Sequence, residues 1–411
     1  MPDMLAEQQA IGTRIKARRL ALGHTQADLA RALGMTQGWV SKVEKGTISL
    51  DSTSLINRIA AALACHPNEL IRRPYVHSVP ENQWQASADL IMRELRRYDL
   101  TPSFEGTPRP SEVLWQETVR LARLRDAAQN RAIITELPDL LAEVRALAEV
   151  SAGHEREEGF ALYALLCKFA HTSAHALGHP ELVALACDRA AWSASLSADP
   201  FMPAVALGMR VWDLWGSAAW DDSLTLADKA LAQLQDAYDA GDALAMRVWG
   251  AGQLRAAVSA ARAGREQETE DRISHAREAA ARIDALPEQP FDRYQLNFSA
   301  GNTDIHAVSV QLELNKHTEA IRLDGRADPA HIATLPKSRR GHHHMDMAQA
   351  WLRDHNRDKA FRELRMAETL APQLVRNHPV ARATLGDLIR GERGRVHEPL
   401  RAMENRFKAS N

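Results

Sequence analysis

Two groups of histidines have a spacing that could bind a metal ion. His171 and His175 are four residues apart, which on a helix would place both imidazoles on one face. The segment His-Thr-Ser-Ala-His lacks the glutamate of a zinc hydrolase motif, and no third ligand is evident. We therefore expect structural histidines and no metal or cofactor. A helical hydrolase that uses these two histidines is the enzyme alternative.

The second group is the run Gly341-His342-His343-His344. Consecutive residues of a helix point about 100° apart, so the three rings cannot all bind one ion, and a polar patch at a helix start is expected. Phosphate-binding glycine loops, Gly-x-Gly-x-x-Gly and nucleophile motifs are missing from the sequence. The three cysteines are widely spaced in apolar surroundings, which is typical of reduced thiols. We therefore expect that the chain is not an enzyme.

The clearest pattern lies in residues 25–46, whose spacing fits two short helices joined by a tight turn. Thr25 and Thr36 can cap the two helices, and Gly34 at the corner can adopt a positive φ. Small or apolar side chains fall where the helices must touch, at Leu29, Ala30, Leu33, Val40 and Val43. The segment therefore predicts a helix-turn-helix.

The flanking residues extend this pattern. An amphipathic stretch before it carries Ile11, Ile15, Leu20 and Leu22, and a second apolar stripe after it comprises Ile56, Ile59, Ala60 and Leu63. A fifth short helix is expected from Pro67. The five helices resemble the lambda-repressor-like, or xenobiotic-response-element (XRE), DNA-binding domain over roughly residues 9–72.

This resemblance implies roles at matching positions. The base-reading candidates are Gln37, Gly38, Ser41 and Lys42. Gly38 departs from the polar residue that some members have there, which puts one base contact in doubt. The candidates for contact with the DNA backbone are Gln26, Thr36, Trp39, Lys45 and Arg14. Arg14 could equally be a solvated charge. Arg19 and Glu44 match a buried ion pair of the family and are expected to be structural.

The charge distribution agrees with a nucleic-acid partner for the first segment only. Residues 1–73 contain ten Lys or Arg against six Asp or Glu, a balance of +4 that leaves −6 for the rest of a chain whose total is −2. No apolar run approaches the roughly 18 residues of a membrane span, and the start lacks the features of a signal peptide. We therefore expect a cytoplasmic protein with no membrane partner.

Most of the 411 residues follow this domain. We expect residues 1–73 to form the DNA-binding domain and residues 74–110 a linker with a connecting helix. Residues 111–411 read as a succession of helices without strand alternation. The offsets of a tetratricopeptide repeat occur at Ala348, Trp351, Ala360, Leu364, Ala367 and Pro372. A weaker copy occurs at Ala257, Ala260, Gly264, Ile273 and Ala276.

Stacked helix pairs of this kind curve into a solenoid with a concave face, although an irregular helical bundle stays an alternative. The whole pattern resembles actinobacterial XRE-type regulators with a tetratricopeptide-like sensor domain. For a ligand groove the candidates are Arg247, Asn297, Asn302, Trp212 and Trp249, since amides can pair with a peptide backbone and some tryptophans could line a groove.

The sequence therefore predicts an all-α protein with a five-helix DNA-binding domain followed by a helical solenoid. The resemblance implies a transcriptional regulator that binds double-stranded DNA as a homodimer, because one recognition helix reads only a few base pairs. A small-molecule or peptide effector of the solenoid is expected. The alternative is a protein-interaction scaffold in which DNA binding is accessory.

Overall fold

The computed structural model describes residues 2–48, 50, 53–63, 65, 70, 82–289, 291–391 and 397–408. All regular elements within these ranges are helices, so the all-α prediction is confirmed. The helix expected from Pro67 lies outside the described residues except for Leu70, which is buried. None of the helices in the described ranges is long and apolar enough to cross a membrane.

The N-terminal domain comprises four described helices, namely α1 (Pro2–Ala21), α2 (Gln26–Leu33), α3 (Gln37–Glu44) and α4 (Thr53–Ala62). They share one core, separate from the rest of the chain, to which every predicted helix-turn-helix core residue contributes. Ile11 and Ile15 also lie in this core, but Leu20 is 58% exposed, contrary to the prediction. Leu20 follows Ile15 by five residues, which turns it about 140° away from the buried face.

Local contacts explain the tight turn between α2 and α3. Thr25 and Asp28 form a capping box at the start of α2, Gly34 has φ 67°, and the Thr36 hydroxyl accepts a hydrogen bond from the Trp39 amide. Gly12 in α1 serves a role that its spacing did not reveal. A Cβ atom there would lie 2.3 Å from the Val43 carbonyl oxygen, so only glycine lets α1 pack against the end of α3.

The remaining helices form the helical array. Its first half comprises α6 (Asn82–Arg96), α7 (Ser111–Asp126), α8 (Asn130–Val150), α9 (Gly153–Leu177), α10 (Pro180–Leu196), α11 (Met202–Leu214), the 3₁₀ helix η1 (Trp215–Ser217) and α12 (Trp220–Asp239). Its second half comprises α13 (Ala243–Arg262), α14 (Glu266–Asp284), α15 (Ala300–Glu313), α16 (His317–Asp324), α17 (Pro329–Ala333), α18 (Lys337–Arg353), α19 (Arg357–Leu370), α20 (Pro372–Asn377), α21 (Pro379–Arg390) and α22 (Glu398–Lys408).

Both predicted repeat units are helix pairs. In α18 and α19 the small positions Ala348, Ala360 and Ala367 are fully buried in one core, and Pro372 begins α20. In α13 and α14 the corresponding Ala257 and Ala276 are also fully buried. Small residues at these crossings let the paired helices approach closely, which confirms the repeat prediction.

Helix α6 is part of the array, although the sequence suggested a separate connecting helix. Its Ala88, Ile91 and Leu95 are fully buried in the main core, and α6 packs against α8 and α10. The loop after it is also fixed, because Arg109 donates to both carboxylate oxygens of Glu143 at 2.6 and 2.9 Å. Residues 82–110, which the sequence assigned to the linker, therefore belong to the array.

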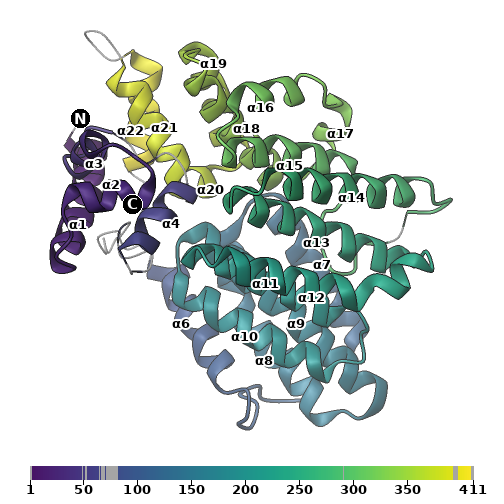
Figure 1. Ribbon diagram of the computed structural model, residues 1–411. Helices are drawn as coiled ribbons and strands as arrows, with labels where there is room; N and C mark the ends of the chain where they lie inside the picture. The colour runs from purple at the N-terminus through teal and green to yellow at the C-terminus, as the bar shows by residue number, and fades with distance from the viewer. Residues whose placement is uncertain are drawn as a thin grey trace.

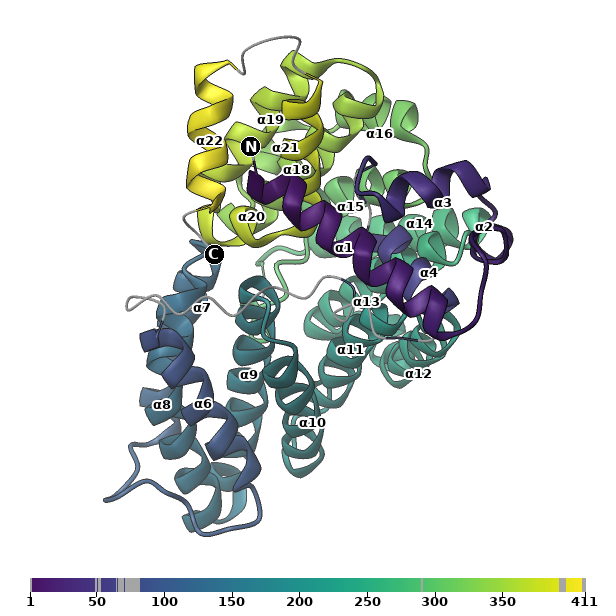
Figure 2. The same cartoon turned by 90° about the vertical axis from the view of Figure 1, so that its left-hand side faces the viewer.

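The array runs as an arc from α8 through α11 and α13 to α18 and α22 (Figure 2). Within it, α9, α11, α13, α15 and α18 each pack against the next helix of that series. This series lies on the inner side of the curve, where successive repeats are most crowded. The arc closes on itself, since α7 contacts α18 and α9 contacts α20.

The N-terminal domain lies against the array, beside α21 and α22 (Figure 1). Among the described residues, α1 contacts α21 and α4 contacts η1 across the boundary between the domains. In the second contact the buried side chain of Asn57 donates a hydrogen bond to the Trp215 carbonyl oxygen. The two domains are therefore in direct contact with each other.

Candidate nucleic-acid interface

The second helix of the motif, α3, presents one face to the core and one to solvent. Val40 and Val43 are buried against α1 and α2. The side chains of Gln37 and Lys42 are exposed on the other face, and Ser41 is partly exposed. An amide, a hydroxyl and an ammonium group on one short helix supply the donors and acceptors that base edges require.

Gly38 lies on the same exposed face. A Cβ atom there would meet nothing within 4 Å, so no packing constraint requires glycine. Because glycine has no side chain to bind a base edge, a lower number of base contacts at this position stays a prediction.

Arg19 and Glu44 form the expected ion pair and tie α1 to the end of α3. The Arg19 Nε atom donates to Glu44 Oε1 at 2.6 Å, and both residues are about 5–6% exposed. Burial alone would raise the pKa of Glu44, but hydrogen bonds from Arg19 and Gln26 outweigh burial and lower it. The carboxylate therefore stays ionised in the folded domain.

Gln26 has a different partner from the one predicted. Its Nε2 atom donates to Glu44 Oε2 at 2.8 Å, so the amide is held at the start of α2 by the ion pair. A phosphate contact through the rest of the amide stays a prediction. The geometry adds a reason for it, because the Arg19–Glu44 pair fixes the side chain before DNA arrives.

The other backbone candidates differ in their surroundings. Lys45 is exposed at the C-terminal end of α3, and the partly exposed Trp39 packs against the domain core. Thr36 uses its hydroxyl as the helix cap. Arg14 donates to the Leu70 carbonyl oxygen at 2.7 Å, so it is not the freely solvated charge that the sequence allowed. Its guanidinium ties α1 to the end of the domain.

The two predicted roles, base reading and phosphate binding, can be distinguished by experiment. Gln37→Ala should weaken operator binding by about 1–3 kcal/mol and relax preference at one base position. Lys45→Ala should weaken binding to all sequences alike. It should also reduce the slope of the logarithm of the association constant against the logarithm of the salt concentration by about 1. Binding titrations over a set of single-base operator variants at several salt concentrations measure both effects.

The control for the loss of a positive charge is Lys229→Ala, since Lys229 is exposed on α12 of the array. We expect this variant to bind like the wild type. Unchanged affinity and base preference in a Gln37→Ala, Lys42→Ala double variant would refute the assignment.

The five ligand-groove candidates do not lie together. Arg247 donates to the Phe298 carbonyl oxygen at 3.2 Å, and Asn302 is 2% exposed with an unpaired Oδ1 atom. Asn297 donates to Asp126 from the loop before α15. Trp212 stacks on His175 with ring centroids 4.6 Å apart. Trp212 contacts α9, whereas Arg247 contacts the segment before α15 that contains Asn297, so the candidates are spread over several parts of the array.

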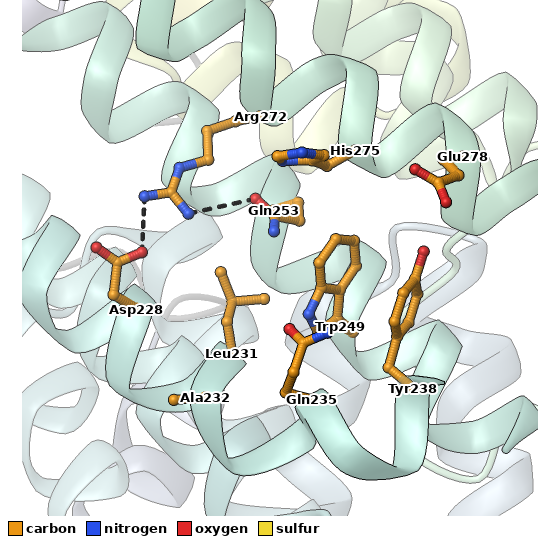
Figure 3. Close-up of a pocket in the computed structure, with 10 residues that line it drawn as sticks. All are labelled: Asp228, Leu231, Ala232, Gln235, Tyr238, Trp249, Gln253, Arg272, His275 and Glu278. Atoms are coloured by element: carbon orange, nitrogen blue, oxygen red, sulfur yellow. Dashed lines mark hydrogen bonds and ion pairs between the residues drawn. The ribbon is translucent and has the colours of Figure 1, made fainter. Parts of the chain in front are cut away.

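Trp249 lies in a separate groove between α12 and α14, shown in Figure 3. Its ring stacks on Tyr238 at 4.1 Å, and Arg272 bridges Asp228 and Gln253 across the groove. The groove has a volume of about 480 Å³ and is open to solvent. Arg247 and Trp249 are two residues apart on α13, so their side chains point about 200° apart.

The histidines whose spacing could bind a metal contact other side chains within the helical array. His171 is fully buried with its ring 4.8 Å from that of His175. His343 faces Asp324 at 2.9 Å, His344 faces Glu363 at 2.6 Å, and His342 meets the ring of His378. The described part of the chain contains no group of three or more potential metal ligands.

Comparisons with known proteins identify the N-terminal domain. Residues 10–72 match the family model described as a helix-turn-helix domain, the module with which transcriptional regulators bind DNA. No curated protein sequence matches the chain.

Two solved structures match the chain with low sequence identity. Bacillus thuringiensis PlcR in complex with the peptide PapR7 and DNA is 16% identical, with 67% of this chain and 96% of that chain covered and a TM-score of 0.29. The apo form of the competence regulator ComR from Streptococcus vestibularis is 15% identical, with 98% of this chain and 99% of that chain covered and a TM-score of 0.28.

Proposed function

We propose that this chain is an XRE-type transcriptional regulator that binds DNA as a homodimer and whose helical array binds a small-molecule or peptide effector. The observation that carries the proposal is the direct contact between the two domains. The Asn57 side chain of α4 binds the carbonyl of Trp215, and the ring of Trp215 is 6.4 Å from that of Trp212. Trp212 in turn contacts His171 and His175 in α9.

This chain of contacts links the inner side of the arc to the DNA-binding domain. A ligand that binds between α9, α11 and α13 would contact α11, which is followed directly by η1, the segment that α4 contacts. Such a ligand shifts the position of the DNA-binding domain only if it prefers one docked arrangement over another. Typical couplings change DNA affinity by about 5–150-fold. We propose no catalytic activity and no cofactor, and we place the protein in the cytoplasm.

Chromatin immunoprecipitation followed by footprinting tests the DNA-binding function. We expect discrete protected sites with two half-sites, which the Gln37→Ala, Lys42→Ala variant loses. A protein-interaction scaffold with accessory DNA binding would give diffuse recovery of DNA that is unchanged in the double variant. That result would overturn the proposed function.

The domain contact itself gives a second prediction. Asn57→Ala should lower the operator affinity of the full-length protein by about fivefold or more, because undocked domains lose the spacing needed to bind two half-sites together. The same substitution in residues 1–75, which contain the separate core of the domain, should leave affinity unchanged. Equal effects in the fragment and the full-length chain would contradict coupling through this contact.

A further inference from the structure

Four basic side chains from four helices converge on the inner side of the arc. They are Arg125 at the end of α7, Lys168 in α9, Arg255 in α13 and Arg339 in α18. Arg125 and Lys168 both donate to the carbonyl oxygen of Gln295, which joins three segments at one point. Burial lowers the pKa of Lys168, and the charges of Arg125, Arg255 and Arg339 lower it further. Lys168 is therefore within electrostatic reach of all three arginines, and Arg339 is within reach of Arg255 and Arg125.

Two of these cations have acidic residues nearby. Arg125 forms an ion pair with Asp126 at 2.8 Å, and Asp292 lies within electrostatic reach of Lys168. The other two lack such a partner among the described residues. Arg255 donates to the Gly208 carbonyl oxygen at 2.7 Å, and Arg339 has only the more distant charge of Asp126 to offset its own. Arg255 and Arg339 are each partly exposed to solvent.

Arg255 and Arg339 stay charged in this environment. Burial and then neighbouring arginines lower the pKa of each to about 10, which is still far above neutral pH. Charges of one sign that are held near one another repel, and a bound anion relieves that repulsion. The neighbouring His306 is neutral, because burial lowers its pKa to about 3, and His342 is neutral for the same reason.

We propose that Arg255 and Arg339 form a binding site for an anionic group of the effector, either a carboxylate or a phosphate. Guanidinium groups bind both anions with two parallel hydrogen bonds. Arg255 is already positioned, since its guanidinium lies 5.6 Å from the centre of the Trp212 ring and a Cβ atom at Gly208 would come within 3.5 Å of its Nε atom. The inference rests on the proposed effector function and specifies its ligand chemistry.

Isothermal titration of the full-length protein with sodium phosphate and, separately, with sodium citrate tests the site at constant ionic strength. We expect binding of at least one probe, and the probe that binds distinguishes a phosphate from a carboxylate ligand. Arg339→Gln and Arg255→Gln should each weaken that binding by about tenfold or more. Arg272→Gln is the matched control, because Arg272 is paired with Asp228 in the groove between α12 and α14. This variant should bind the probe like the wild type.

Thermal melts in sodium chloride provide an independent readout of the same site. Without an anion ligand, Arg339→Gln should melt above the wild type, since it removes a repelling charge, and phosphate or citrate should raise the melting temperature of the wild type only. Arg339→Lys, which keeps the charge and loses the paired donors, should bind the probe with intermediate affinity. Binding of neither probe, or full binding in both glutamine variants, would overturn the anion site.

Operator titrations with and without the probe separate this site from the proposed function. Anion binding that leaves operator affinity unchanged supports the site and argues against sensing through it. An operator response to phosphate or citrate that survives in both glutamine variants would overturn the site while supporting an effector function elsewhere in the array.

Discussion

Arg145→Met should lower the free energy of unfolding of the array by about 3–5 kcal/mol, because it leaves the buried carboxylate of Glu94 without its counter-charge. Arg145 is fully buried, and its Nε atom donates to Glu94 Oε1 at 2.7 Å. Its Nη1 atom also donates to the carbonyl oxygens of Arg97 and Leu100, both at 2.7 Å. The substitution therefore leaves the Glu94 carboxylate, in the last turn of α6, without its ion-pair partner. It also leaves two carbonyl groups just beyond the end of α6 without their hydrogen-bond donor.

Calorimetric melting of the full-length protein measures this loss, and hydrogen exchange of α6 should report it locally. The control is Arg120→Met, whose side chain is 50% exposed and pairs with Glu117 and Glu136 on the surface. Exposed pairs contribute at most about 1 kcal/mol. Equal melting temperatures for the Arg145 and Arg120 variants would show that α6 is not held by the buried pair.

The N-terminal domain could be predicted from sequence because its determinants are local. Thr25, Gly34 and Thr36 act within three residues of their own positions, and the apolar spacing of Val40 and Val43 directly sets their buried face. The ion pair between Arg19 and Glu44 came from the family resemblance. Gly12 was missed, since the constraint on it comes from a carbonyl group in another helix.

In the array, sequence predicted the helix pairs and missed how they are placed. The repeat offsets around Ala348 come from contacts between helices that are adjacent in sequence, so they appear as a regular pattern in the sequence. The attachment of α6 depends on Arg145, 51 positions after Glu94, and no periodicity encodes that contact. The inner cations Arg255 and Arg339 likewise come from helices far apart in sequence. The packing of α13 and α18 on either side of α15 brings these helices near each other.

Arg19→Met should lower the stability of the N-terminal domain by about 3–5 kcal/mol and abolish DNA binding by unfolding it. The domain has a small core, and a domain of this kind has little more than about 5–15 kcal/mol of stability in total. Loss of Arg19 strands the Glu44 carboxylate and frees the His24 carbonyl oxygen, to which Arg19 Nη1 donates at 2.7 Å. The array should keep its own melting transition, since its cores are separate.

Scanning calorimetry and limited proteolysis of the full-length chain measure the effect, and Arg31→Met is the control because its pair with Asp28 is exposed. The pH dependence gives a further test with a definite sign. Because the folded pKa of Glu44 is lowered, its contribution is present above its ordinary value of about 4.3 and is lost as the pH falls through the folded pKa. Glu44→Gln should remove this acid sensitivity from the domain's transition. An Arg19→Met protein that melts like the Arg31 variant would show that the pair does not stabilise the DNA-binding domain.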